Sequence, residues 1–332
     1  RARADGRTAG QGSIEGIDGA DAQPRGVPAE VPAAHGIPGA DSGYQAGQFR
    51  RRSLPAGRGP AVVRPQSARN PSLHLGCGLG NGLANLHNAR KGRVPVVNIV
   101  GDHATYHVKY DAQLQSDIET VARNVSPWVR TSQSTEALCC DAVEAIATSW
   151  GPPGQVATLI LPADVSWSDG GVPAAPPTIT PPSRNTDDAI AAIARVLQAG
   201  GTNALLLGGR ALREPTLVAA ARVAATTGAK LLAEVFPTRI ERGAGLPHVE
   251  RIAYLAELAS VQLAELDNLI LVDAKPPVSF FAYPGKKSDL VPGTCTVHVL
   301  ASATQDVLDS LEGLVVHVGA ADTVPALQAP IR

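Results

Sequence analysis

The sequence predicts an α/β protein with two tandem, doubly wound parallel-sheet domains. Residues 94–100 (VPVVNIV) form a continuous apolar run, as expected for a strand buried on both faces of a parallel sheet. Similar runs then alternate with amphipathic helical stretches over short connections, which is typical of a parallel sheet covered by helices. Residues 169–184 are rich in Pro, Gly and Ser, so we expect a linker between two alternating halves.

The first half contains one long helical pattern and a second buried strand. Residues 134–150 have the spacing of an amphipathic helix, and Ser134 or Thr135 is the predicted N-cap. Residues 156–161 (VATLIL) are predicted to form a buried strand that ends at Pro162. With residues 94–100, these elements form the core of the first predicted sheet.

The second half repeats the alternation after the linker. Asn185 or Thr186 is predicted to cap a helix that runs through Gln198, and Gly228 is predicted to end another. The predicted strands span residues 204–207, 230–235, 269–272 and 296–300, and the further predicted helices span residues 214–227, 251–266 and 304–311.

The N-terminal segment differs from the rest of the chain. Ala, Gly, Arg and Pro supply more than half of residues 1–70, and no helical or strand period is long enough to bury a face. We expect disorder there, because such a segment cannot offset its chain entropy by burying apolar surface. The predicted domain organisation is therefore an anomalous segment at 1–70, a first domain at 71–168, a linker at 169–184 and a second domain at 185–325.

Composition excludes several classes of function. The formal net charge is −1, without a basic stripe, so nucleic acid is not an expected partner. Apolar runs are too short to span a membrane, and no signal-peptide core is present, so we expect a cytoplasmic protein. The four cysteines form no CxxC pair, which argues against a disulfide framework or a zinc site and fits a reducing compartment.

A glycine-rich segment is the densest motif. Residues 73–88 read LHLGCGLGNGLANLHN, with glycines at 76, 78, 80 and 82. We expect Asn81 to cap a helix over residues 82–90, and glycines before a helix start suit an anion or a polar ligand. The spacing does not match the GxGxxG dinucleotide motif.

In order and spacing, these motifs resemble the thiamine-diphosphate-dependent enzymes of the acetolactate synthase and benzoylformate decarboxylase kind. Residues 78–81 read GLGN, residues 94–101 read VPVVNIVG, and residues 157–165 read ATLILPADV, as in the pyrimidine-binding domain of that family. Residues 204–209, 229–232, 269–274 and 280–285 resemble its central, Rossmann-like domain.

The resemblance implies thiamine diphosphate and magnesium as cofactors, a 2-keto acid as substrate and a homo-oligomer. It implies that His74 is a catalytic residue and that Gly76, Gly78, Gly80 and Asn81 bind cofactor. No metal ligand is assigned, because the family holds its metal in a third domain that we expect to be missing. The activating glutamate is also expected to be missing, since residues 48–53 read QFRRRS and arginine accepts no hydrogen bond.

Other readings of these residues stay open. His74 can equally be a histidine at a strand end satisfied by backbone groups. His103 and His107 are predicted to lie in a solvated loop, His87 on a helix, and Gln115 is a partial substitute for a glutamine of the family.

Alternatives also remain for the chain as a whole. It could be a non-catalytic pseudoenzyme or dimerising α/β protein, or an FAD- or dinucleotide-binding domain that uses Gly208, Gly209 and Arg210. FAD is disfavoured because Lys275-Pro276-Pro277 replaces the family's Arg-Phe. We further hypothesise that residues 1–70 are an out-of-frame translation, and that the chain alone is inactive.

Overall fold

The computed structural model describes residues 72–329, and the predicted α/β class with two parallel sheets is confirmed. The first sheet has the strand order β1-β2-β4-β3, and every pairing in it is parallel. Its strands are β1 (Ser72–His74), β2 (Val96–Asp102), β3 (Trp128–Thr131) and β4 (Val156–Pro162). We call this sheet and its helices the four-stranded unit.

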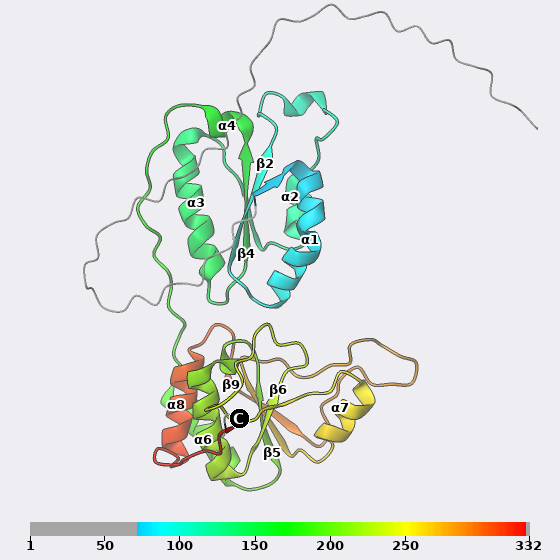
Figure 1. Ribbon diagram of the computed structural model, residues 1–332, viewed down its shortest axis with the longest axis vertical. Coiled ribbons are helices and arrows are strands. Elements are labelled where there is room, and N and C mark those ends of the chain that lie inside the picture. Colours follow the sequence, from blue (N-terminus) through cyan, green and yellow to red (C-terminus); the bar gives the residue numbers. More distant parts are fainter. Residues whose placement is uncertain (1–71, 330–332) are drawn as a thin grey trace, which may run out of the picture. The chain divides into compact units, whose positions relative to one another are not determined.

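Helices cover both faces of this sheet (Figure 1). The helices α1 (Leu75–Lys91) and α2 (Ile118–Arg123) lie on one face, where Leu79, Val100 and Ile160 share a core. Helix α3 (Thr135–Trp150) packs on the other face, against Val97 and Ala157 through Ala145. The sheet is therefore buried on both sides, which explains the continuous apolar runs of β2 and β4.

The second sheet has the order β7-β6-β5-β8-β9 and is again entirely parallel. Its strands are β5 (Asn203–Leu207), β6 (Lys230–Ala233), β7 (Glu250–Arg251), β8 (Asn268–Val272) and β9 (Thr296–Ala301). Because β5 is the first strand in sequence and lies at the centre, the chain switches direction there, which is the doubly wound topology. We call this sheet and its helices the five-stranded unit.

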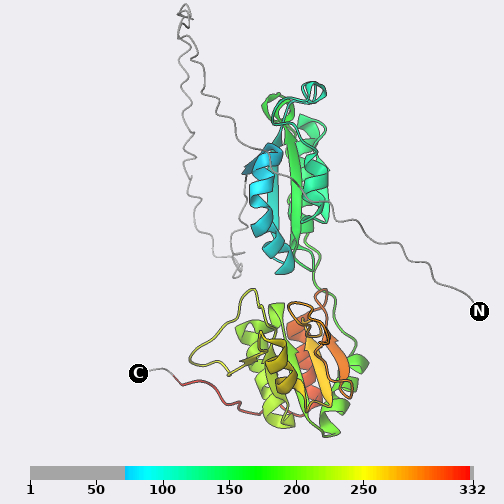
Figure 2. The same cartoon turned by 90° about the vertical axis from the view of Figure 1, so that its right-hand side faces the viewer.

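The five-stranded unit also has helices on both faces, as the two perpendicular views show (Figure 2). Helices α5 (Asp187–Gln198), α6 (Glu214–Thr227) and α8 (Val307–His317) share one core, and α7 (Ala256–Leu263) closes the other. The predicted caps are confirmed at two helices. The Ser134 hydroxyl accepts a hydrogen bond from the Ala137 N–H at α3, and the Thr186 hydroxyl accepts one from the Ala189 N–H at α5.

Some predicted boundaries are wrong. The helix predicted over residues 251–266 is the short strand β7, a loop and the eight-residue helix α7, and the last helix begins at Val307 instead of residue 304. The short elements α2 and β3 were not predicted, because six and four residues carry too little periodicity to identify. The remaining short elements are η1 (Val108–Tyr110), α4 (Ala163–Trp167) and η2 (Gly209–Leu212).

None of the helices formed by residues 72–329 is both long and apolar enough to cross a membrane. The predictions for residues 1–70, including disorder, the missing glutamate and the out-of-frame hypothesis, fall on residues outside the described range.

Candidate functional site

The carboxyl ends of the parallel strands form one edge of the four-stranded unit. In the register of the sheet, His74 at the end of β1 lies opposite Gly101 of β2, and Asp102 lies opposite Pro162 of β4. The loop that leaves β2 carries His103 and returns at Asp117, the N-cap of α2. Parallel α/β sheets bind ligands at this edge, so it is the first place to look for a site.

The glycine-rich segment has a different structure from the one predicted. Helix α1 already begins at Leu75, with His74 as its N-cap residue, so Asn81 lies within the helix instead of capping it. The prediction of a helix over residues 82–90 is therefore wrong at its start. All four glycines are helical, and Asn81 is exposed. Glycine is a poor helix former, but the packing of Leu75 and Leu79 in the core outweighs that preference.

Gly76 is the glycine that the packing requires. A Cβ atom at this position would lie 1.8 Å from Oγ of Ser116 and 2.9 Å from its Cβ, which is far inside van der Waals contact. At Gly80, by contrast, a Cβ would meet nothing within 4 Å. The glycine at 76 thus lets the loop before α2 approach the first turn of α1.

Three buried polar atoms at this edge have no hydrogen-bond partner among the described residues. They are Nε2 of His103, Oε1 of Gln115 and Oγ of Ser116. The amide nitrogen of Gln115 donates to the Ser116 carbonyl, so only its oxygen is free. Because unpaired buried polar atoms are costly, these three are candidates for pairing with water or a polar ligand.

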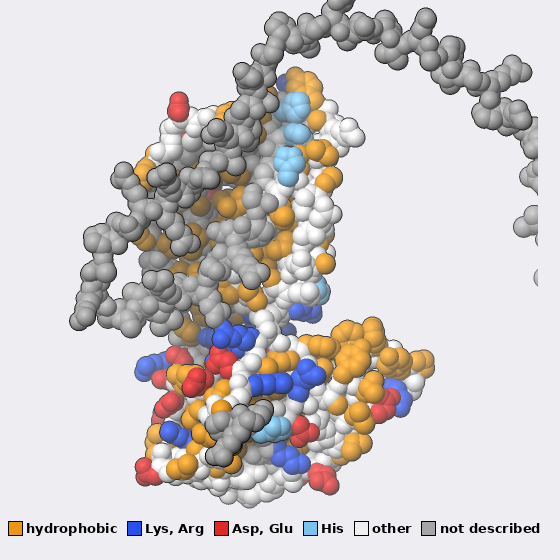
Figure 3. All heavy atoms as spheres, viewed as in Figure 1, with side chains coloured by type: hydrophobic (Ala, Val, Ile, Leu, Met, Phe, Trp, Pro, Cys, Tyr) orange, Lys and Arg blue, Asp and Glu red, His pale blue; other side chains and the backbone are white. Residues whose placement is uncertain are grey.

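Histidine and tyrosine rings extend this edge. The rings of His103 and His107 lie 5.2 Å apart, and those of His107 and Tyr110 lie 5.7 Å apart. Histidine side chains gather on the same end of the four-stranded unit in the space-filling view (Figure 3). His103 is partly buried and its Nε2 fully so, which differs from the solvated loop predicted for it.

The strand ends are also fixed by an acidic side chain. Asp164, at the start of α4, accepts a hydrogen bond of 3.0 Å from the Thr105 backbone N–H and another from the Thr105 hydroxyl. The Thr105 hydroxyl is the main reason that the pKa of Asp164 lies below its ordinary value. This pair ties the loop after β2 to the end of β4.

The other predicted residues lie apart from this cluster or have structural surroundings. His74 is exposed at the strand end, and His87 is exposed further along α1. Among residues 72–329, no group of three or more His, Cys, Asp or Glu side chains is placed to hold a metal ion.

The carboxyl edge of the five-stranded unit is acidic. The Gly209 N–H donates to a Glu234 carboxylate oxygen over 3.1 Å, and the Arg210 N–H donates to Asp273 over 2.8 Å. Burial raises the pKa of Glu234 above the ordinary value of a glutamic acid. A Cβ at Gly208 would lie 2.6 Å from the Asp273 carbonyl oxygen, so close approach of β8 accounts for this glycine.

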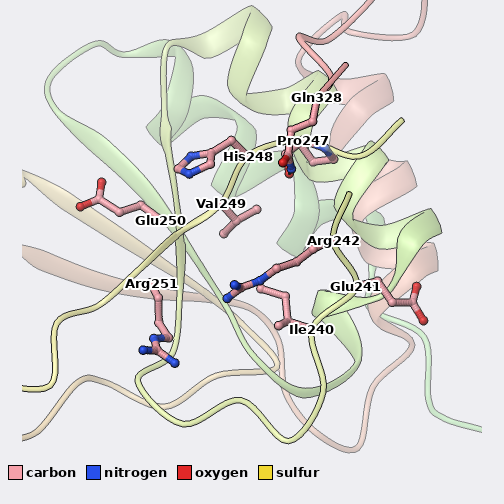
Figure 4. A pocket seen from close by; sticks show the side chains of 9 residues that line it. All are labelled: Ile240, Glu241, Arg242, Pro247, His248, Val249, Glu250, Arg251 and Gln328. Carbon is pink, nitrogen blue, oxygen red and sulfur yellow. The ribbon is translucent and has the colours of Figure 1, made fainter. Parts of the chain in front are cut away.

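A separate hollow of about 420 Å³ lies beside the segment between β6 and β7 (Figure 4). Arg242 and Arg251 line it, and neither forms an ion pair within residues 72–329. Glu250, which also lines it, is bound by the Gln262 side chain. The hollow contains none of the predicted site residues.

Comparison with known proteins shows which proteins the chain is similar to. No family model matches it. Over 246 residues, 74% of the chain, it is 54% identical to a Mycobacterium tuberculosis protein (strain ATCC 25618 / H37Rv) provisionally named acetolactate synthase large subunit IlvX. The chain is therefore similar to the acetolactate synthase kind of thiamine-diphosphate-dependent enzyme. It is acetolactate synthase large subunit-like, and it covers 45% of the length of that relative.

Solved structures agree on the fold. A provisionally assigned thiamin diphosphate-dependent enzyme from Mycobacterium smegmatis matches with a TM-score of 0.66 and 19% identity, covering 79% of this chain and 53% of that one. The thiamine diphosphate-dependent 4-hydroxybenzoylformate decarboxylase of Rhodococcus jostii RHA1 matches with a TM-score of 0.65 and 18% identity, covering 79% and 52%. The resemblance seen in the motifs is thus confirmed, and the chain spans about half the length of these solved structures.

Proposed function

We propose that this chain is part of an acetolactate synthase-like enzyme that acts on 2-keto acids, and that it supplies the pyrimidine side of the cofactor site but not the diphosphate side. The observation that carries the proposal is that buried, unpartnered atoms of His103, Gln115 and Ser116 lie in the segment between β2 and α2, at the edge where His74 ends β1. An aminopyrimidine ring offers donors and acceptors that such atoms can pair with.

The polar atoms of the described residues suit the pyrimidine ring of thiamine diphosphate but not its diphosphate. Thiamine diphosphate supplies a carbanion-stabilising thiazolium ring when it is bound. The described residues offer polar atoms for a ring, yet they place no carboxylate cluster for a magnesium ion. We therefore assign no diphosphate contact and no reaction step to them.

His74 has a defined part in this proposal. It is exposed at the carboxyl end of β1, where its imidazole is open to hydrogen bonding with a substrate. His103 is partly buried in the loop that follows β2, and we assign it a hydrogen-bonding role. Of the four predicted cofactor-binding residues, Gly76 acts through packing, because it lets the loop that carries Ser116 approach α1, whereas Gly80 and Asn81 are exposed on the helix.

Activity assays test the proposal. The purified chain, supplied with thiamine diphosphate, magnesium and pyruvate, is expected to form no acetolactate and to release no carbon dioxide. Calorimetric titration is expected to show weak thiamine diphosphate binding that does not depend on magnesium and that Ser116→Ala or Gln115→Ala weakens further. Measurable turnover, or binding that requires magnesium, would contradict this assignment.

An FAD- or dinucleotide-binding function is less well supported. The backbone N–H groups of Gly209 and Arg210, which would have to face a diphosphate, already donate to Glu234 and Asp273. Two carboxylates beside these donors would repel a diphosphate. Flavin absorbance in the purified protein would reverse this judgement. A non-catalytic, dimerising protein stays the second candidate, and a stable dimer without cofactor binding would favour it.

A further inference from the structure

The phenylalanines of the described chain are exposed together on one surface. Phe236, Phe280 and Phe281 have exposed fractions of 61%, 54% and 55%. Their rings continue into those of Tyr254 and Tyr283 through centroid distances between 4.5 and 6.4 Å. A protein with only 4% aromatic residues gathers five of them in solvent, which marks a binding surface.

Four of these rings, those of Tyr254, Phe280, Phe281 and Tyr283, line a hollow of about 300 Å³ beside the first turn of α7. In the space-filling view, hydrophobic side chains gather over this end of the five-stranded unit (Figure 3). A cavity of about 150 Å³ can hold benzene, so the hollow has room for one aromatic ring and a short polar substituent. Tyr254 and Phe280 line it and lie 5.3 Å apart at a tilt of 50°, and Phe281 stands edge-on to Phe280.

The hollow also has a cation at its rim. Lys286 Nζ lies 3.3 Å from a Glu257 carboxylate oxygen, and both side chains are more than half exposed. Exposed pairs of this kind are weak, so an incoming carboxylate can replace Glu257 as the partner of Lys286. The Glu257 carboxylate is held at the helix end mainly by its own backbone N–H, and then by Lys286, which together lower its pKa.

We propose that this hollow binds a small aromatic carboxylic acid, whose ring packs among Tyr254, Phe280 and Phe281 and whose carboxylate pairs with Lys286. The size of the hollow and the single lysine at its rim argue for a small acid over a protein segment, which needs a much larger contact. This site stands independently of the cofactor proposal, because it lies wholly within the five-stranded unit and uses none of the residues assigned above.

Titration calorimetry of the full chain with simple probes tests the proposal. Phenylacetate carries both the ring and the carboxylate, acetate lacks the ring, and 2-phenylethanol lacks the charge. Phenylacetate is expected to bind about tenfold more tightly than either of the other two. Equal binding of acetate or of 2-phenylethanol would overturn the proposal.

Variants locate the site. Phe280→Ala is expected to weaken phenylacetate binding about fivefold, because it removes one wall of the ring slot. Lys286→Gln should weaken it about threefold, and Glu257→Gln should strengthen it by freeing the lysine. The matched control is Arg242→Gln, which removes a cation from the other hollow (Figure 4) and is expected to change nothing.

The same variants separate a small ligand from a second copy of the chain. Circular dichroism confirms that each variant is folded, and sedimentation at several concentrations measures self-association. If Phe280→Ala or Phe281→Ala abolishes a dimer and leaves phenylacetate binding unchanged, the surface is an interface and the proposal fails. Unchanged sedimentation together with weakened phenylacetate binding is the expected result.

Discussion

Gly76 and Gly80 lie four residues apart in α1 and have opposite surroundings. A side chain at 76 would collide with Ser116, whereas a side chain at 80 would enter open space. Gly76 is therefore required by packing, whereas Gly80 only weakens the helix. The spacing of glycines in the sequence does not distinguish these two roles.

Gly76→Ala is expected to lower the free energy of unfolding by about 1–3 kcal/mol, because the methyl group overpacks a close contact. Gly80→Ala should raise it by about 0.5–1 kcal/mol, since alanine is the better helix former and nothing obstructs it. Urea denaturation followed by circular dichroism measures both changes. Equal effects of the two substitutions would refute the assigned role of Gly76.

Glu234 gives the five-stranded unit a pH dependence with a definite sign. Burial raises its pKa in the folded state above that of the unfolded chain, so the folded state holds the proton more tightly. Its contribution to stability is therefore most favourable below the ordinary value of 4.5 and is lost as pH rises through the raised pKa.

Glu234→Gln removes this titration and keeps an oxygen for the Gly209 N–H. The variant is expected to gain stability relative to the native chain as pH increases from about 4.5 towards neutrality. Urea unfolding across that range provides the measurement. If the stability gained by Glu234→Gln over the native chain is constant with pH, or shrinks as pH rises, the pKa of Glu234 is not raised in the folded state.

The helices and strands differ in how far their sequences predict them. The long apolar runs of β2, β4 and β5 were recognisable because both faces of each strand are buried. The capping residues of α3 and α5 were recognisable because a hydroxyl at an N-cap has a local chemical role. Strand β7 has only two residues, so its pairing with β6 depends on the assembled sheet and not on local pattern.

Helix α3 offers a test of its predicted start. Ser134→Ala removes the side-chain acceptor for the Ala137 N–H and is expected to cost about 1 kcal/mol of stability. Ser134→Asp should keep the cap and retain most of that stability. Urea denaturation measures the free energy of unfolding of both variants. A loss of the same size in both would show that the missing cap does not cause the destabilisation.

The candidate site could be predicted in part. The resemblance pointed to His74, which stays a prediction, and to Gln115, while the burial of the Gln115 oxygen and the part of Ser116 depend on how the loop before α2 packs. The aromatic hollow was not predicted, because its rings come from positions 254, 280, 281 and 283, which only the folded unit brings together.

At the scale of the whole molecule, the two units have cores of unequal size. Most of the largest fully buried side chains belong to the five-stranded unit, among them Leu205, Leu217 and Leu263, and the four-stranded unit contributes Leu79, Leu159 and Ile160. The free energy of local unfolding increases with the amount of buried apolar contact. We therefore expect the two sheets to unfold locally with different free energies.

Hydrogen exchange followed by mass spectrometry measures that difference. The amides of β5 and β8 are expected to exchange most slowly, and those of β2 and β4 sooner. Slower exchange in β2 than in β5 would show that core size does not set the order.

The distribution of rings also has an optical consequence. All three tryptophans, Trp128, Trp150 and Trp167, belong to the four-stranded unit, whereas the five-stranded unit carries only tyrosine and phenylalanine, gathered on its surface. Tryptophan emission thus reports on the first sheet alone. Tyrosine emission arises from both units, since Tyr106 and Tyr110 lie in the first and Tyr254 and Tyr283 in the second, so tryptophan is the unlabelled probe that distinguishes the two sheets.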